Sequence, residues 1–317
     1  MWAVYITSSF SRALSTKASE HFNVFSVANM SEHEDFYFTS SHLTNIEIED
    51  FQSAFHRAKA LIRILNGILR LKNLPKVAFE PDRIFYMKNS DQWSNYSIYN
   101  DSQLEYKELQ SPFQANSSLL QKYKRTSEEV NRNDRYVVDI FDLAYNEELA
   151  KEVLILFSLT KIDPLYLLVN TLKIIETIEF DLGLQIEKRE NGKKKKSGEI
   201  KKERKIIWAK VSAVLGDESA NFFKAYNFFK APGDGSFQHF INTRDGSGIF
   251  ARHGANNNNY QDEKGNQLPI ISFDDIEHNI RVLIYEWVNY KLVTLGKDRY
   301  PLIQRESGSS EGFGFDL

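Results

Sequence analysis

A glycine- and asparagine-rich break at residues 241–259 holds the side chains best suited to acid–base chemistry. Arg252 and His253 are adjacent in it, and Arg244 lies eight residues before Arg252. A histidine titrates near neutral pH and can take or give a proton, while an arginine can stabilise charge on a phosphoryl oxygen. On a loop between two helical patterns both can face a cleft, so the pattern predicts a site for phosphate chemistry. A structural alternative is that Arg252 pairs with a carboxylate of a neighbouring helix while His253 caps a helix end.

Three side chains on two further helical patterns could complete such a site. Glu176 is a candidate buried carboxylate that orients Arg252 or His253, and Asn227 could supply a side-chain amide. Lys173 lies three residues before Glu176, so these two can instead form an ion pair along one helix. Asn227 can equally serve a helix end. The sequence leaves these alternatives open.

A basic segment, residues 187–205, is the strongest charge feature of the chain. It has ten lysines and arginines against four glutamates, a balance of +6, whereas the whole chain carries −3 and the remainder therefore about −9. The segment contains two glycines and no aromatic residue, which predicts a solvated loop between helices. Lys194, Lys195 and Lys196 are candidate ligand-binding residues in it, because lysines attract phosphate groups.

Composition excludes several function classes. The 317 residues include no cysteine, which excludes disulfide frameworks, thiolate zinc sites and cysteine nucleophiles and fits a reducing compartment. None of the seven histidines forms an HxxxH or HxH pair, and no Walker or dinucleotide-binding loop occurs, so we expect neither a metal nor a cofactor. No apolar run approaches the roughly 20 residues that span a bilayer, and no secretory signal is visible. We therefore expect a soluble cytoplasmic protein.

The N-terminal part of the chain combines β-rich segments with one helical pattern. Five segments have strand composition: residues 2–6, 22–27, 36–39, 77–79 and 84–87. Between the third and the fourth, apolar residues recur in steps of three and four from Ile48 to Leu69, which predicts a long amphipathic helix that Pro75 ends. We expect this helix to pack across a sheet that is mostly antiparallel.

From Tyr136 onward the apolar spacing is helical. Asp163-Pro164 predicts a helix start, and Ser272 or Asp274 opens the last long helix. In the helix that follows Asp163 we expect five residues to face inward: Leu165, Leu168, Val169, Leu172 and Ile175. The fold class is therefore predicted as α+β, with three parts: a mixed N-terminal domain (1–134), a helical domain (135–300) and a flexible tail (301–317).

Five short motifs occur in an order that resembles a group of bacterial proteins: Leu65-Asn66-Gly67, Leu172–Ile178, Phe223–Asn227, Ala251–Gly254 and Glu286-Trp287. The helical part, residues 137–295, resembles a divergent member of the HEPN-like class. That resemblance implies an all-α domain and a place among toxin or phage-defence systems, whose members are often ribonucleases or nucleotide-binding modules. An active HEPN ribonuclease has its arginine and histidine a few residues apart on one helix. Here eight residues, two of them glycines, separate Arg244 from His253.

The function expected from these features is binding of RNA or another phosphate-bearing ligand by the helical part, as a homodimer and away from membranes. A catalytic version would cleave RNA without metal, with His253 as acid or base, Arg252 and Arg244 on the phosphate, and Glu176 as orienting group. The rival hypothesis is a non-catalytic sensor or scaffold that acts through contacts with a partner protein.

Overall fold

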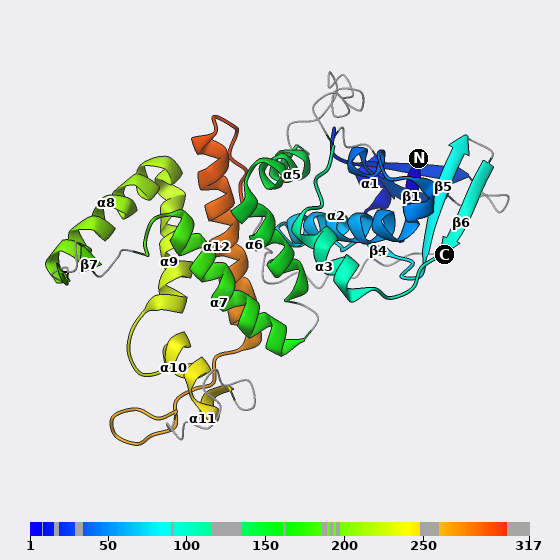
Figure 1. Ribbon diagram of the computed structural model, residues 1–317. Helices are drawn as coiled ribbons and strands as arrows, with labels where there is room; N and C mark the ends of the chain where they lie inside the picture. Colours follow the sequence, from blue (N-terminus) through cyan, green and yellow to red (C-terminus); the bar gives the residue numbers. More distant parts are fainter. Residues whose placement is uncertain are drawn as a thin grey trace, which may run out of the picture.

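The protein is an α+β molecule with an antiparallel sheet in its N-terminal half and helices in its C-terminal half, as a computed structural model shows (Figure 1). This confirms the predicted fold class. The structure describes residues 1–7, 9–15, 19–28, 34–89, 92–115, 135–160, 163–185, 189–190, 193–194, 197–247 and 260–302.

The main sheet has six strands among the described residues: β1 (Trp2–Thr7), β2 (Asn23–Ala28), β3 (Glu34–Thr39), β4 (Ala78–Phe79), β5 (Arg83–Asn89) and β6 (Gln92–Ser97). The five predicted segments correspond to β1 to β5. The strand order is β2-β3-β1-β5-β6, every pair is antiparallel, and β4 pairs with the C-terminal end of β1. Because β3 lies between β1 and β2 in space, the chain forms a split β-α-β arrangement.

The helices follow in chain order: α1 (Ser11–Ser15), α2 (Phe51–Leu71), α3 (Ser102–Gln110), α5 (Tyr136–Asn146), α6 (Glu148–Leu159), α7 (Pro164–Asp181), α8 (Ser197–Leu215), α9 (Ser219–Lys230), α10 (Phe237–Asn242), α11 (Arg244–Ser247) and α12 (Phe273–Thr294). The 3-10 turns are η1 (Ser41–Leu43), η2 (Ile48–Asp50) and η4 (Gly216–Glu218), and a hairpin pairs β7 (Arg189–Glu190) with β8 (Lys193–Lys194). Two predicted starts are confirmed. The Asp163 side chain accepts a hydrogen bond from the Leu165 backbone N–H, and Ser272 caps α12.

Helix α2 joins the sheet to the helical half. It contacts β1 and β5 on one side and packs against α5 and α6 on the other (Figure 1). Gly67 permits the close approach of α6, because a Cβ at this position would lie 2.3 Å from the carbonyl oxygen of Leu154. The Leu65-Asn66-Gly67 motif thus has a packing role at the centre of the molecule.

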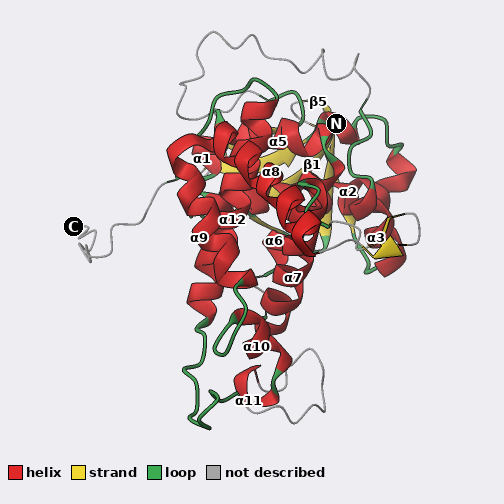
Figure 2. Cartoon of the chain, turned by 90° about the vertical axis from the view of Figure 1, so that its left-hand side faces the viewer, coloured by secondary structure: helices red, strands yellow, loops and turns green. Residues whose placement is uncertain are grey.

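Two expectations about the helical half are wrong. Leu165 and Val169 do not face inward, since they are 45% and 40% exposed, whereas Leu168 and Ile175 are buried as predicted. Residues 197–205 of the basic segment do not form a loop but the first half of α8. Lysine, glutamate and arginine have high helix propensity, and α8 reaches away from the rest of the molecule, where a charged helix stays solvated (Figures 1 and 2).

The hydrophobic core is continuous from the sheet into the helical half. One cluster of buried side chains includes Val4 of β1, Leu65 of α2, Phe157 of α6 and Trp287 of α12. The predicted boundary at residue 134 lies outside the described residues, so the division into two domains stays a prediction. Of the predicted tail, residues 303–317 lie outside the description, while the Pro301 carbonyl accepts a hydrogen bond from buried Lys72 at 2.7 Å.

Candidate functional site

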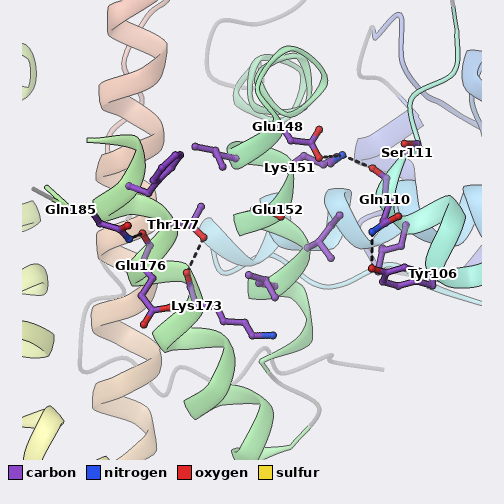
Figure 3. A pocket seen from close by; sticks show the side chains of 15 residues that line it. Tyr106, Gln110, Ser111, Glu148, Lys151, Glu152, Lys173, Glu176, Thr177 and Gln185 are labelled. Atoms are coloured by element: carbon purple, nitrogen blue, oxygen red, sulfur yellow. Dashed lines mark hydrogen bonds and ion pairs between the residues drawn. The ribbon is translucent and has the colours of Figure 1, made fainter. Parts of the chain in front are cut away.

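A groove of about 820 Å³ opens between α3, α6 and α7 (Figure 3). It contains two of the predicted site residues, Lys173 and Glu176, which both project from α7. Tyr106 and Gln110 of α3 line the opposite side, and α6 lies between the two walls. The groove therefore depends on the packing of α3, a helix from the N-terminal half, near two helices of the C-terminal half.

Glu176 is exposed, so the expectation of a buried carboxylate at this position is wrong. The ion pairs found between described residues do not include one between Lys173 and Glu176. No described residue of α10 or α11 lines the groove, so the groove does not bring Glu176 to Arg244. Lys173 and Glu176 are thus neighbours on a shared wall rather than parts of a site with the predicted arginine.

Lys151 of α6 fixes one side of the groove. Its Nζ donates a hydrogen bond of 2.6 Å to the Gln110 carbonyl and lies 2.6 Å from Glu148 Oε1 (Figure 3). The residue is buried, and a buried ammonium is stable only when it is paired. The Lys151 contacts therefore tie α3 to α6. The position of Lys151 in an apolar helical pattern did not predict this contact.

The groove is both acidic and apolar. Glu152 and Glu176 are exposed in its lining beside one exposed cation, Lys173, and the largely buried Ile155 also lines it. Two aromatic side chains at the lining remain largely in water, Tyr106 at 63% and Phe180 at 61% exposure. Carboxylates repel phosphate, so this groove suits an apolar segment with positive charge better than a nucleic acid.

The buried carboxylate of α7 is Glu179 instead. Tyr226 of α9 donates its phenolic O–H to Glu179 at 2.6 Å, and Lys230 lies 3.0 Å from the same carboxylate. Burial, followed by this hydrogen bond to Glu179, raises the pKa of Tyr226 above its ordinary value. Asn227, the predicted amide donor, is exposed next to Tyr226. The hydrogen bond from Tyr226 and the ion pair with Lys230 hold α9 against α7. The Phe223–Asn227 motif therefore lies where these two helices pack together.

The residues with the predicted acid–base chemistry, Arg252 and His253, lie outside the described residues. Arg244 begins the short helix α11, and its side chain is not described. Their roles therefore stay predictions.

The described residues on either side of that segment are well packed. Ser247 is buried, and Tyr260 is fully buried with its ring 5.0 Å from His239. The Tyr260 hydroxyl donates to the Pro269 carbonyl at 3.2 Å. Ser247 and Tyr260, the described residues on either side of Arg252 and His253, are thus both held in the packed fold.

The basic segment is placed in part. Lys194 lies in β8 and its side chain is not described, while Lys195 and Lys196 lie outside the described residues. Five cations of α8 are exposed: Lys201, Lys202, Arg204 and Lys205 of the basic segment, and Lys210 beyond it. Helix α8 projects at the left of Figure 1, the side that faces the viewer in Figure 2.

A buried polar chain, which the sequence analysis did not predict, joins the two halves at His21, His42 and Asp142. The backbone N–H groups of Gln114 and Ala115 donate to His42 Nδ1 at 3.1 and 2.8 Å, which leaves the proton of His42 on Nε2. His42 Nε2 lies 3.0 Å from His21 Nδ1, so His21 has its proton on Nε2, 3.2 Å from Asp142 Oδ1. Burial, and then the charges of His21 and Arg57, lowers the pKa of His42 to about 3.

Comparison with known proteins gives no match. No family model matches the chain, and no curated protein or solved structure matches it significantly. Within the described ranges, no helix is long and apolar enough to cross a membrane. In the same part of the chain, no group of three or more metal-ligating side chains could hold a metal ion. The resemblance to the HEPN-like class stays a prediction.

Proposed function

We propose that the protein binds RNA, and that α8 supplies the main phosphate contacts. The observation behind this proposal is charge separation: exposed Lys201, Lys202, Arg204 and Lys205 stand on a projecting helix, while the rest of the chain is acidic. Lysine and arginine that neutralise phosphates release counterions, which gives sequence-independent affinity that falls as salt rises. The acidic remainder repels the strand and so directs it to α8.

We further propose that cleavage, if the protein is an enzyme, proceeds without metal at His253, Arg252 and Arg244. His253 would take the proton of a ribose 2′-hydroxyl, whose oxygen attacks the adjacent phosphorus. The bond from phosphorus to the 5′-oxygen then breaks, and protonated His253 returns its proton to that oxygen, which leaves a 2′,3′-cyclic phosphate. Arg252 and Arg244 would stabilise the charge on the phosphoryl oxygens. Glu176 is left out of this scheme, because it is exposed rather than buried as an orienting carboxylate would be.

The binding test compares two triple variants. Lys201→Gln, Lys202→Gln and Lys205→Gln together remove three cations of α8, and Lys76→Gln, Lys107→Gln and Lys264→Gln remove three exposed lysines elsewhere. For single-stranded RNA the slope of log K against log salt should become about 2 units less steep in the α8 variant, from about 0.7 per phosphate contact. The control variant should keep the original slope. Equal slopes in all three proteins would rule out α8 as the binding element.

The cleavage test uses labelled RNA in EDTA with wild type, Arg252→Ala and His253→Ala. Products from wild type alone, with both variants folded, would establish the site. If His253→Ala instead lowers the melting temperature and wild type leaves RNA intact, His253 is structural and the catalytic part of the proposal fails.

A protein-binding scaffold is the second candidate function, and exposed apolar side chains of α7 favour it. Leu165, Tyr166 and Val169 expose apolar surface on the N-terminal half of α7, outside the groove lining. Exposed apolar patches mark protein interaction sites. We propose that a second copy of the chain covers these side chains; Val169→Asp should then convert a dimer to a monomer in analytical ultracentrifugation. A wild type that is monomeric at high concentration would exclude the homodimer.

A further inference from the structure

We propose that the sheet face opposite α2 binds the unpaired bases of single-stranded nucleic acid by stacking. The face presents one aromatic ring from each of five strands: Tyr5 (β1), Phe25 (β2), Tyr37 (β3), Phe85 (β5) and Trp93 (β6). We call this the aromatic face. The inference rests on the proposed association with nucleic acid, and it specifies an unpaired strand and a second contact surface far along the molecule from α8 (Figure 1).

The strand registers bring these rings to one side of the sheet. Tyr37 pairs with Tyr5 of β1 and with Phe25 of β2. Residues directly opposite one another across a strand pair point to the same face, and their chain neighbours point to the other. Val4 and Phe38, the neighbours of Tyr5 and Tyr37, accordingly lie in the core beneath α2. The aromatic face is thus the reverse of the surface that α2 covers.

Tyr37 lies at the centre of the aromatic face. Its ring centroid lies 5.6 Å from Tyr5, 5.7 Å from Phe25, 5.7 Å from Phe85 and 4.8 Å from Trp93. Stacking surfaces of this kind are how sheets bind single-stranded RNA and DNA, because every base has a π-face.

The five rings are not part of the hydrophobic core. None belongs to the buried cluster or to the partly buried side chains packed against it, and all five are half-buried. Each of the five rings therefore keeps part of its surface in water, and a stacked base covers surface of this kind.

Charge sets the path of the strand across the aromatic face. Arg83, two residues before Phe85 on β5, is exposed and can contact a phosphate. At the other side, burial and then the charge of Asp35, with a further contribution from Glu80, raises the pKa of Tyr37. Carboxylates repel phosphate but accept hydrogen bonds from the N–H groups of bases, such as N3–H of uracil and thymine. The phosphate backbone therefore runs along β5 and β6, and the bases point toward β3.

The test measures binding of fluorescein-labelled oligo-U and oligo-dT at low salt. Tyr37→Leu keeps apolar bulk but removes the central ring, and it should weaken binding about 5- to 150-fold, the contribution of one stacked base. Tyr106→Leu makes the same exchange at the groove and should leave the dissociation constant unchanged. Phe85→Leu replaces Tyr37→Leu if the latter loses the wild-type circular dichroism spectrum. The two oligonucleotides distinguish RNA preference from general single-strand binding, and either result with the expected loss supports the proposal.

Trp93 supplies a direct readout, because a stacked base quenches indole fluorescence. Trp2 and Trp287 are buried, so Trp93 and Trp208 are the partly exposed indoles of the four in the chain. Because Trp208 lies on α8 and can itself report RNA bound there, the measurement uses Trp208→Phe, in which Trp93 is the partly exposed indole that remains. Oligonucleotide should quench this variant, and unchanged fluorescence at saturating oligonucleotide, or quenching that duplex produces equally well, would overturn the proposal. A Tyr37→Leu variant that changes oligomeric state but not binding would overturn it as well, in favour of a second copy.

The outcome separates this inference from the proposed function. If the α8 variant loses affinity while folded Tyr37→Leu and Phe85→Leu do not, the aromatic face is refuted and RNA binding by α8 stands. If wild type binds neither oligonucleotide, both proposals fall.

Discussion

His42 makes the stability of the fold depend on pH in a range where few other groups titrate. Its Nδ1 accepts two backbone N–H bonds and its Nε2 faces His21, so a second proton has no acceptor in the folded state. In the unfolded chain the pKa of a histidine is 6.5, whereas burial lowers the pKa of His42 to about 3. The unfolded state thus binds a proton between these values and the folded state does not, so stability is complete above pH 6.5 and falls on acidification.

The size of the effect follows from linkage. Each pH unit between the two pKa values changes the free energy of unfolding by about 1.4 kcal/mol, so acidification from pH 7 to pH 5 should cost about 2 kcal/mol from His42 alone. Depressed carboxylates such as Asp142 lose their contribution only at lower pH, because the pKa of Asp142 lies below its ordinary 3.8. Glu286 differs from these carboxylates, because burial raises its pKa, but it is present in both proteins compared below and does not affect their difference.

The assay is urea unfolding at pH 7 and pH 5 for wild type and His42→Asn. The asparagine Oδ1 can replace Nδ1 as acceptor for Gln114 and Ala115 but does not titrate. We expect the variant to be less stable at pH 7, since it loses the contact with His21, and to lose about 2 kcal/mol less than wild type on acidification. His56 and His278 have lowered pKa values too, but they contribute equally to both proteins. Parallel losses in wild type and variant would refute the reasoning.

Two further predictions concern packing. Gly67→Ala should destabilise the protein by about 1–2 kcal/mol, because overpacking against the Leu154 backbone costs about 1–3 kcal/mol and outweighs the roughly 1 kcal/mol gain in helix propensity. Gly198→Ala in α8 is the control, because a Cβ at this position would have no atom within 4 Å, and this variant should be neutral or more stable. Thermal unfolding compares the two variants with wild type. If both variants change the melting temperature equally, α2 and α6 are not tightly packed at Gly67. Tyr226→Phe should cost about 1.5–3 kcal/mol in urea unfolding, because a buried carboxylate loses a hydrogen bond. Asn227→Ala, next to it but exposed, is the control, and an equal loss there would argue against the clamp on α7.

Part of the candidate site was visible in the sequence. Lys173 and Glu176 were singled out by their spacing, and both line the groove, but nothing in the spacing indicated that Glu176 would be exposed and Glu179 buried. Glu176 and Glu179 are separated by less than one helical turn on α7, and the position of α9 decides which of these two carboxylates is covered. The basic segment was recognised by its charge, yet its C-terminal half is helical, because the same lysines and glutamates that favour solvation also favour a helix.

The sequence by itself determined the local elements. The β-rich composition of residues 2–6, the three-and-four spacing from Ile48 to Leu69, and the caps at Asp163 and Ser272 depend only on near neighbours in the chain, and each predicted element appears where it was expected. Tertiary structure decided what these elements bring together. The histidine chain joins η1 to α5, and the aromatic face needs five strands in one register. Such sites form from residues far apart in sequence, since strand order and helix packing are set by burial of the whole core rather than by any local pattern.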